Sequence, residues 1–236
     1  MALSEPWVLM AGVLGLYLYD AALLLFHDEV VLEARRRGFV VSGGSSLELG
    51  GRHLFMPNPC CPHRVLLRLA WSGTASPLQR VRWQRVGFTL AALAPWTWLL
   101  LGLFFVGLPC ALWFGSHAVL LGWLLLTYLV IVVMLAQVYR RRKALNLSAR
   151  AVLALAFDAL LCAPFALNIV RKISLRQQAV PDLRRAAASM LTPAQQATLL
   201  DLLRGRIRTS LDFVEPGSAA SDSLQACLTH FEDNTP

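Results

Sequence analysis

The chain has 236 residues, and 56% of them carry hydrophobic side chains while 15% are charged. Soluble domains are typically about 45–50% apolar, so this composition argues against a soluble globular protein and predicts a membrane-embedded one. The formal net charge is +8, and because the basic residues flank apolar segments we expect anionic lipid headgroups, not nucleic acid, as their partner.

The first apolar segment covers residues 7–26, which matches the roughly 20 residues that a helix needs to cross a bilayer. It has no basic leader or small-residue cleavage site, so we expect it to stay in the mature protein as an anchor. Glu29 and Glu33 precede arginines at helical spacing, and Gly38 offers a C-terminal stop. Residues 1–38 are therefore predicted to be a transmembrane helix with a cytoplasmic extension.

Residues 39–87 are predicted to form a cytoplasmic loop with two parts. The pairs Gly43-Gly44 and Gly50-Gly51 lie between short apolar runs, and a two-residue type I′ turn needs positive φ at both of its positions. We therefore expect a small β-hairpin here. After three closely spaced prolines, the stretch from 64 to 85 mixes arginines with large apolar residues, which predicts a helix lying along the headgroups.

Residues 88–138 are predicted to be a transmembrane helical hairpin. Its two apolar segments, 88–108 and 118–138, are each long enough to cross the bilayer. The link between them contains no Asp, Glu, Lys or Arg. A short uncharged link of this kind is typical of two antiparallel spans.

The basic residues predict the orientation of these spans. Residues 27–87 contain nine arginines and residues 140–143 are all basic, whereas the N-terminus and the 109–117 link contain no basic residue. The positive-inside rule then puts the N-terminus outside and most polar segments in the cytoplasm. Twenty of the 22 basic residues are arginine, which favours a GC-rich bacterial genome and hence a multi-pass protein of the inner membrane.

A fourth apolar segment, 151–170, lies within the basic region 139–180. It is long enough to cross, but it carries Asp158, Pro164 and Asn168, and crossing would put the basic residues that follow on the outside. Three structures fit: a re-entrant helical pair bent near Pro164, an apolar helix packed on the inner ends of the other spans, or a fourth span. We favour the first two together.

Residues 181–236 are predicted to form a cytoplasmic helical region with an acidic tail. Thr192, Pro193 and Gln195 match an N-cap, a first-turn proline and a capping box, which predicts a helix to about Ile207. The tail is acidic and favours partial disorder with a short helix over 224–231. The fold class is thus mainly α: a polytopic α-helical integral membrane protein with a small cytoplasmic β-hairpin element and C-terminal cytoplasmic helices.

Two acidic residues inside apolar segments are candidate functional residues. Asp20 lies about six residues, or roughly 9 Å, from the predicted inner end of the first helix, and Asp158 lies within the fourth apolar segment. A carboxylate facing hydrocarbon is costly and often marks a polar partner or an ion path. We favour structural pairing over ion or proton movement for both.

A second group of candidates is His53, Cys60, Cys61 and His63, which have the side chains of metal ligands and reactive thiols. Their spacing lacks the Cys-x2-Cys pair that brings two thiolates to one zinc ion, so we predict ordinary loop packing, no metal and no cofactor. Serine-hydrolase and phosphate-loop motifs are missing from the sequence. The predicted headgroup contacts are Arg64, Arg68, Arg80, Arg82, Arg85, Arg140, Arg141, Arg142 and Lys143.

Three functions are compatible with this pattern. The leading one is a non-enzymatic membrane subunit that assembles a larger complex through its cytoplasmic loop and tail, with a protein partner or further copies of itself. The second is a small transporter or ion- or proton-conducting oligomer that uses Asp20 and Asp158. The third is a membrane enzyme acting on a lipid-linked substrate, which would use His53, His63 and the basic surface.

Overall fold

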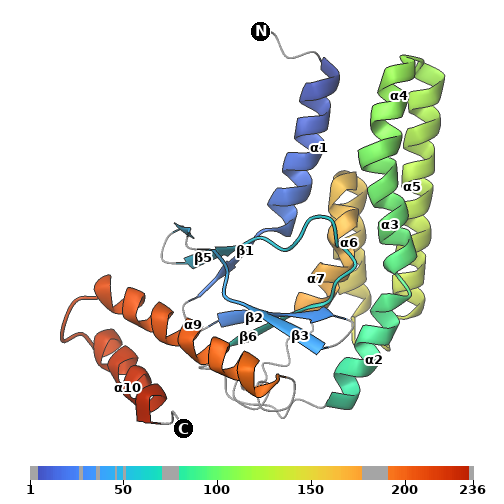
Figure 1. Ribbon diagram of the computed structural model, residues 1–236. Coiled ribbons are helices and arrows are strands. Elements are labelled where there is room, and N and C mark those ends of the chain that lie inside the picture. Colours follow the sequence, from blue (N-terminus) through green and yellow to red (C-terminus); the bar gives the residue numbers. More distant parts are fainter. Residues whose placement is uncertain are drawn as a thin grey trace. The chain divides into compact units, whose positions relative to one another are not determined.

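The chain is mostly helical with a small β-hairpin region, as the computed structural model in Figure 1 shows. It divides into two compact units. The helical unit comprises Met1–Ala22, Pro57–Val65 and Gln79–Gln177, and the mixed unit comprises Leu23–Met56, Leu66–Leu78 and Gln178–Pro236. The structure describes residues 5–26, 29–35, 38–45, 47–49, 52–70, 80–176 and 191–233.

All regular secondary structure in the described residues of the helical unit is helical, and the loop at 57–65 is irregular. They are α1 (Glu5–Ala21), α2 (Arg80–Ala91), α3 (Ala94–Gly102), the π-helical turn η1 (Leu103–Gly107), α4 (Leu108–Phe114), α5 (His117–Arg140), α6 (Ala149–Leu161), the 3-10 segment η2 (Ala163–Asn168) and α7 (Ile169–Arg176).

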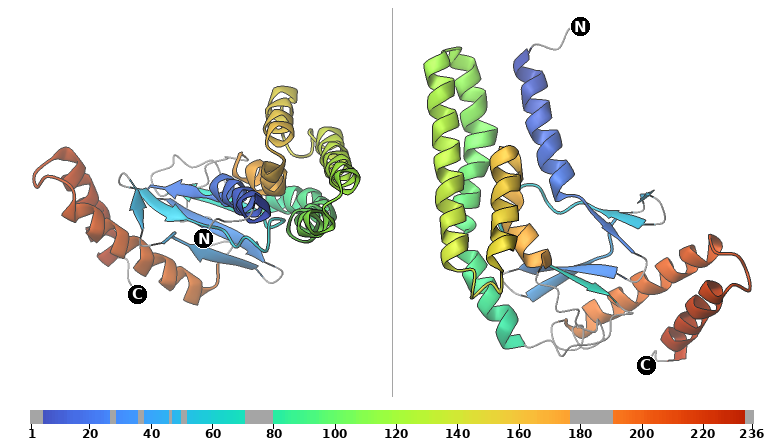
Figure 2. Two further views of the ribbon diagram at one scale, coloured as in Figure 1. Left: turned by 90° about the horizontal axis from the view of Figure 1, so that it is seen from above. Right: turned by 180° about the vertical axis from the view of Figure 1, so that it is seen from behind.

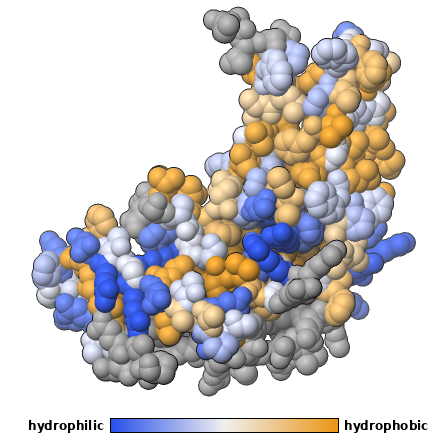
Figure 3. All heavy atoms as spheres, viewed as in Figure 1, coloured by the Kyte–Doolittle hydropathy of each residue, from blue (hydrophilic) through white to orange (hydrophobic). Residues whose placement is uncertain are grey.

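Two helices in the described part of the chain are long and apolar enough to cross a membrane, namely Val86–Phe114 and His117–Arg140. Only 28% of the most apolar stretch of each is buried within the protein. Figure 3 shows hydrophobic side chains gathered over this hairpin. A core helix of a soluble domain would have most of that surface covered, so the exposed surface of these two helices favours a membrane-spanning hairpin.

A tight turn and an indole hydrogen bond fix the hairpin of α3, η1, α4 and α5. Gly115 ends α4 in the left-handed region at φ 62°, which glycine adopts without strain. Within the hairpin, Trp123 Nε1 of α5 donates to the Leu103 carbonyl in η1 over 2.8 Å. A π-helical turn leaves carbonyls displaced from the regular α-helical pattern, and this indole satisfies one of them.

The first helix is shorter than predicted. It ends at Ala21, and Leu23 already begins strand β1, so both the span to residue 26 and its helical extension to 37 are wrong. Pro6–Ala21 is an apolar helix below the length of the other two. The charged spacing of 29–37 suits a helix, but Val30, Val31 and Leu32 are consecutive buried residues, which a strand covered on both faces accommodates.

The fourth apolar segment is bent near Pro164, as the sequence predicts. Ser148 caps α6 by accepting a hydrogen bond from the Ala151 amide, and the helix ends before Cys162, whose φ and ψ of −131° and 89° leave the helical region. The Tyr128 hydroxyl on α5 donates to the Leu160 carbonyl over 3.2 Å. Figure 2 shows α6 beside the C-terminal half of α5 and the chain returning in α7.

The mixed unit contains two three-stranded antiparallel sheets. One has the order β1-β5-β4 and the other the order β3-β2-β6. The strands are β1 (Leu23–Leu25), β2 (Glu29–Arg35), β3 (Gly38–Ser42), β4 (Glu48–Leu49), β5 (Arg52–Phe55) and β6 (Leu66–Ala70). In the second sheet Leu32 lies opposite both Val41 and Leu67, which makes β2 the central strand.

The predicted β-hairpin is present as β4 and β5, and the first glycine pair does not lie between these strands. Leu49 of β4 pairs with Arg52 of β5, so Gly50 and Gly51, which lie outside the described residues, separate the two strands. The predicted interfacial helix is wrong over 66–70, which form β6, and residues 71–79 lie outside the described residues. Alternation of buried Leu67 and Leu69 with Arg68 is a strand pattern that competes with the helical one.

The described C-terminal residues, 191–233, contain the helices α9 (Pro193–Asp212) and α10 (Ala219–Asp233) of the mixed unit. The capping box of Thr192 and Gln195 is confirmed. Both helices extend beyond their predicted ends, and the acidic tail is helical to residue 233. Helix α9 lies so close to the residue after β3 that a Cβ at Gly43 would be 2.7 Å from Leu202, which accounts for a glycine there.

A buried polar cluster as the candidate functional site

Six polar side chains of the helical unit form what we call the buried polar cluster. Tyr17 and Asp20 come from α1, Asp158 from α6, Asn168 from η2, and Arg171 and Lys172 from α7. Arg171 and Lys172 follow Asn168 by three and four residues, and side chains at this spacing lie on the same face of a helix. The cluster thus joins α1 to the segment 158–172, which is distant from it in the sequence.

Lys172 lies between the two carboxylates. Its Nζ is 2.6 Å from Asp20 Oδ1 and 3.7 Å from Asp158 Oδ2, and it sits 4.7 Å from the centre of the Phe165 ring. The Asp20 and Lys172 side chains are 9% and 19% exposed, whereas that of Asp158 is 44% exposed. The pair with Asp20 is therefore the shielded one, and Asp158 lies at the cluster's open side.

Asn168 connects Asp20 to the rest of the cluster. Its Nδ2 donates to Asp20 Oδ2 and to the Tyr17 carbonyl, each over 3.1 Å. Its Oδ1 accepts from Arg171 Nη1 over 2.9 Å. Both ends of this buried amide are thus used, and this is the condition under which a polar side chain is tolerated in an apolar interior.

Arg171 ties α7 to the proline-rich loop at 57–62. The residue is 2% exposed, and its Nη2 donates to the Asn58 carbonyl over 2.5 Å and to the Cys61 carbonyl over 3.1 Å. The Tyr17 hydroxyl donates to the Pro59 carbonyl over 2.6 Å. These bonds connect backbone carbonyls of the loop to side chains of α1 and α7.

The cluster balances two acids against two bases and can therefore be buried without a net charge. Removing one member would leave an uncompensated buried charge, at a cost of about 3–5 kcal/mol for a fully buried pair. Chemically, the same arrangement holds one cation between two carboxylates. Either a structural joint or a site for an exchangeable proton or cation fits this geometry.

Asp20 lies nearer to the end of its helix than the sequence suggests. With α1 ending at Ala21, Asp20 is in the last turn and not roughly 9 Å inside the helix. Its predicted structural pairing has a partner in Lys172, which the sequence reasoning missed. Two features of the sequence could have pointed to Lys172. It is one of two lysines in a chain with 20 arginines, and it lies two residues after an apolar segment that contains Asn168.

The second group of candidates is divided between the two units. His53 lies on β5 of the mixed unit, and Cys60, Cys61 and His63 lie in the loop of the helical unit. Cys60 and Cys61 are free thiols. In the part of the chain that the structure describes, no group of three or more His, Cys, Asp or Glu side chains is placed to hold a metal ion.

His63 packs against an aromatic side chain. Its ring lies 5.4 Å from the Trp98 ring, and its Nδ1 is buried with no hydrogen-bond partner. Burial lowers the pKa of His63, and the charges of Arg64 and Arg171 lower that pKa further. At neutral pH the imidazole is therefore uncharged and serves as part of the packing around α3.

The predicted headgroup residues lie at four places in the chain. Arg140 is the last residue of α5 and is followed by Arg141, Arg142 and Lys143, and Arg142 lies 4.2 Å above the Tyr139 ring. Arg64 lies in the loop of the helical unit, and the side chains of Arg80, Arg82 and Arg85 are outside the described set. Arg68 instead pairs with Glu29 and donates to the Leu24 carbonyl within the mixed unit.

No relative of this chain emerges from comparison with known proteins: no family model, no curated protein and no solved structure matches it. The function is therefore inferred from the chain's own residues. The features available for that inference are the exposed apolar hairpin, the buried polar cluster and the surfaces of the mixed unit.

Proposed function

We propose that this chain is a non-enzymatic integral membrane subunit that assembles a larger complex through its polar segments. The exposed apolar surface of the α3–α5 hairpin carries this proposal. Leu125 near the middle of α5 is 71% exposed, and Leu121 and Leu129, four residues before and after it, are each 59% exposed. Such a surface is stable in hydrocarbon and would drive aggregation in water.

The proposed topology has the N-terminus outside, α1 and the hairpin as spans, and the mixed unit in the cytoplasm of a bacterial cell. Helix α6, with 13 residues, is only about 20 Å long, while the hydrocarbon core is about 30 Å thick. A re-entrant α6–α7 pair enters and leaves on the same side. That path keeps the basic residues after 170 inside, in agreement with the positive-inside rule.

Helix α1, which is about 25 Å long by its 17 residues, is a short span in this proposal. A short span is accommodated by local thinning of the bilayer or by packing on neighbouring elements. The buried polar cluster supports the second route, because Asp20 and Tyr17 fix the inner end of α1 to η2 and α7. The cluster thus acts as the joint that holds the helices of the helical unit together.

A protein partner or a second copy is proposed to bind the mixed unit. Leu49 in the short strand β4 and Leu47 just before it are 58% and 64% exposed. An edge strand of two residues with exposed apolar side chains is a favourable place for another chain to pack. This surface is our candidate for assembly.

The proposal is tested by the molar mass of the chain purified in a mild detergent. A complex or oligomer well above the 26.1 kDa of one chain is expected from light scattering with the detergent contribution subtracted. The variant Leu47→Ser with Leu49→Ser should dissociate it, whereas Leu125→Ser, on the lipid-facing hairpin, should not. A lone monomer at all concentrations would contradict the proposal.

Ion or proton conduction is the second candidate, and the position of Lys172 between Asp20 and Asp158 favours it. A transported cation that competes with Lys172 for either carboxylate would release one contact of the lysine, which gives the site two states. In reconstituted vesicles, Asp20→Asn should abolish flux while the folded yield is preserved. Unchanged flux in that variant would remove this candidate.

A further inference from the structure

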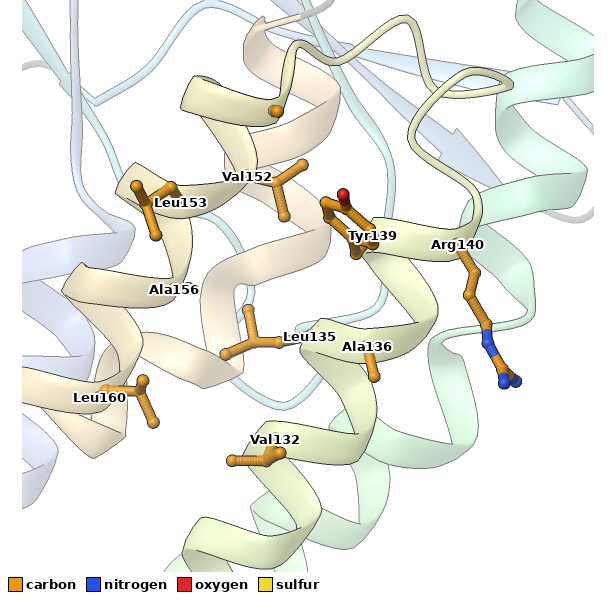
Figure 4. Close-up of a pocket in the computed structure, with 10 residues that line it drawn as sticks. Val132, Leu135, Ala136, Tyr139, Arg140, Val152, Leu153, Ala156 and Leu160 are labelled. Carbon is orange, nitrogen blue, oxygen red and sulfur yellow. The ribbon is translucent and has the colours of Figure 1, made fainter.

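A groove in the helical unit lies between α5 and α6, away from the buried polar cluster. It has a volume of about 590 Å³ and is open along its length to the surroundings. Figure 4 shows side chains of both helices along it. The lining residues are Val132, Leu135, Ala136, Tyr139, Arg140, Ala149, Val152, Leu153, Ala156 and Leu160.

The groove is apolar along most of its length and becomes polar at one end. From Val132 to Ala136 on α5, and from Val152 to Leu160 on α6, every lining side chain is aliphatic. Tyr139 and Arg140 line the other end, where α5 finishes. A long apolar channel with a polar mouth matches a molecule that has a hydrocarbon chain and a polar head.

The polar end carries positive charge from several side chains. Arg142 lies over the ring of Tyr139, and Arg150 is exposed in the first turn of α6 beside Ala149. Figure 4 shows the Arg140 side chain directed away from α6, so Arg142 is the cation placed by a direct contact with a lining residue. The head that fits this end is therefore anionic.

We propose that this groove binds one acyl chain of an anionic phospholipid, with the phosphate at the end formed by Tyr139, Arg142 and Arg150. The proposal rests on the membrane integration proposed above. From Tyr139 to Val132 the groove follows α5 for about 10 Å, which is two thirds of one leaflet of the hydrocarbon core, about 15 Å thick. The phosphate end also coincides with the basic end of the span, where headgroups lie.

A lipid chain fits this groove better than a further helix. Its volume is within the roughly 300–1,000 Å³ of sites for small molecules, whereas an α-helix with its side chains is about 10–12 Å wide. The small residues Ala136, Ala149 and Ala156 deepen the groove between larger neighbours. A narrow channel of this kind accepts a single flexible chain, and the cations supply affinity for its phosphate.

Native mass spectrometry of the full chain in detergent tests the proposal, with phosphatidylglycerol and phosphatidylcholine of identical acyl chains as probes. We expect one phosphatidylglycerol to be retained preferentially. Ala156→Phe, which fills the groove, should weaken its apparent affinity about tenfold, and the surface variant Arg142→Gln should reduce the preference over phosphatidylcholine about fivefold. Leu125→Phe, on an exposed part of α5 outside the groove, is the matched control and should change neither value.

Three outcomes would overturn the lipid assignment. Equal retention of the two lipids by the wild type is one, and an equal loss in Leu125→Phe and Ala156→Phe is another. A doubled mass that Ala156→Phe abolishes would assign the groove to a second copy instead. Alkaline carbonate extraction of cell membranes tests the membrane integration separately. A chain that stays in the pellet but shows no lipid preference would contradict only the lipid site in the groove. A chain that is extracted would contradict both the lipid site and the membrane integration.

Discussion

The two units of the molecule differ in where some of their polar and apolar side chains lie. In the helical unit the side chains of Asp20, Asn168 and Arg171 are inside while Leu125 is 71% exposed. In the mixed unit Val30, Val31 and Leu32 are fully buried, and α9 has polar residues on its exposed side. This contrast is what the proposed membrane insertion of the α3–α5 hairpin would produce.

Arginines have the same structural task in both units. Arg171 donates to carbonyls of the 57–62 loop in the helical unit, and Arg206 on α9 donates to the Glu29 carbonyl in the mixed unit. A guanidinium has several donors in fixed geometry, so one side chain can satisfy several backbone acceptors at once. What distinguishes the units is therefore their outer surface, and this is the difference that the following experiments address.

The largest effect is expected from a matched pair of leucine substitutions. Leu32→Ala removes a fully buried side chain from the central strand and should lower the free energy of unfolding of the mixed unit by about 4 kcal/mol. Leu125→Ala, on the exposed face of α5, should cost less than about 0.5 kcal/mol in detergent. Denaturant titration of both variants provides the measurement, and equal costs would break the comparison.

The second effect concerns the ion pair of the helical unit. Lys172→Ala leaves Asp20 shielded without its cation and should destabilise the protein by about 3 kcal/mol, the low end of the range for buried pairs. The thermal unfolding midpoint in detergent measures this, with the exposed Lys143→Ala as control. Replacing the pair by Asp20→Asn with Lys172→Met should recover most of the loss. A Lys172→Ala variant as stable as wild type would show that the cluster is not a joint.

A smaller effect is expected from the amide that links the cluster. Asn168→Ala removes hydrogen bonds to Asp20, Arg171 and the Tyr17 carbonyl and should cost about 1–3 kcal/mol, because partners remain buried. Asn168→Ala and Lys172→Ala should be non-additive, since both act on Asp20. Additive losses in a double-mutant cycle would mean that the two side chains act separately.

The smallest effect is a pH dependence from His63. Its pKa is lowered by burial and by the charges of Arg64 and Arg171, so the folded state disfavours the protonated form relative to the unfolded state. Its contribution to stability is fully present above about pH 6.5, the ordinary histidine pKa, and decreases as the pH falls through the lowered pKa. Thermal midpoints between about pH 7.5 and 5.5 should fall less steeply in His63→Gln than in wild type. Parallel curves would contradict this assignment.

Sequence reasoning predicted the features that depend on neighbouring residues. The capping box at Thr192, the hairpin with its uncharged link and the bend near Pro164 all follow from short-range chemistry, and all are present. Strand β2 was missed because the Glu29 and Glu33 spacing fits a helix equally well. Pairing with β3 and β6 makes this segment a strand, and the sequence of one segment does not reveal its pairing partners.

The candidate site was only half predictable for the same reason. Asp20 and Asp158 stand out as charges in apolar segments, but their shared partner Lys172 lies just after the segment of Asp158 and far from Asp20 in the sequence. The role of Arg171 depends on backbone carbonyls of the 57–62 loop. Every residue has a backbone carbonyl, so the sequence does not show which ones Arg171 contacts. Contacts between distant segments, and contacts to backbone atoms, were the parts that only the structure supplied.

The central claim is that the α3–α5 hairpin crosses a membrane, and cysteine labelling from one side tests it most directly. One variant keeps only Cys60, in the loop of the helical unit, and another is cysteine-free except for Ser116→Cys, which is in the link before α5. With an impermeant maleimide on intact cells, we predict labelling of Ser116→Cys alone, and of Cys60 only after lysis. Labelling of both positions from the same side would contradict the claim.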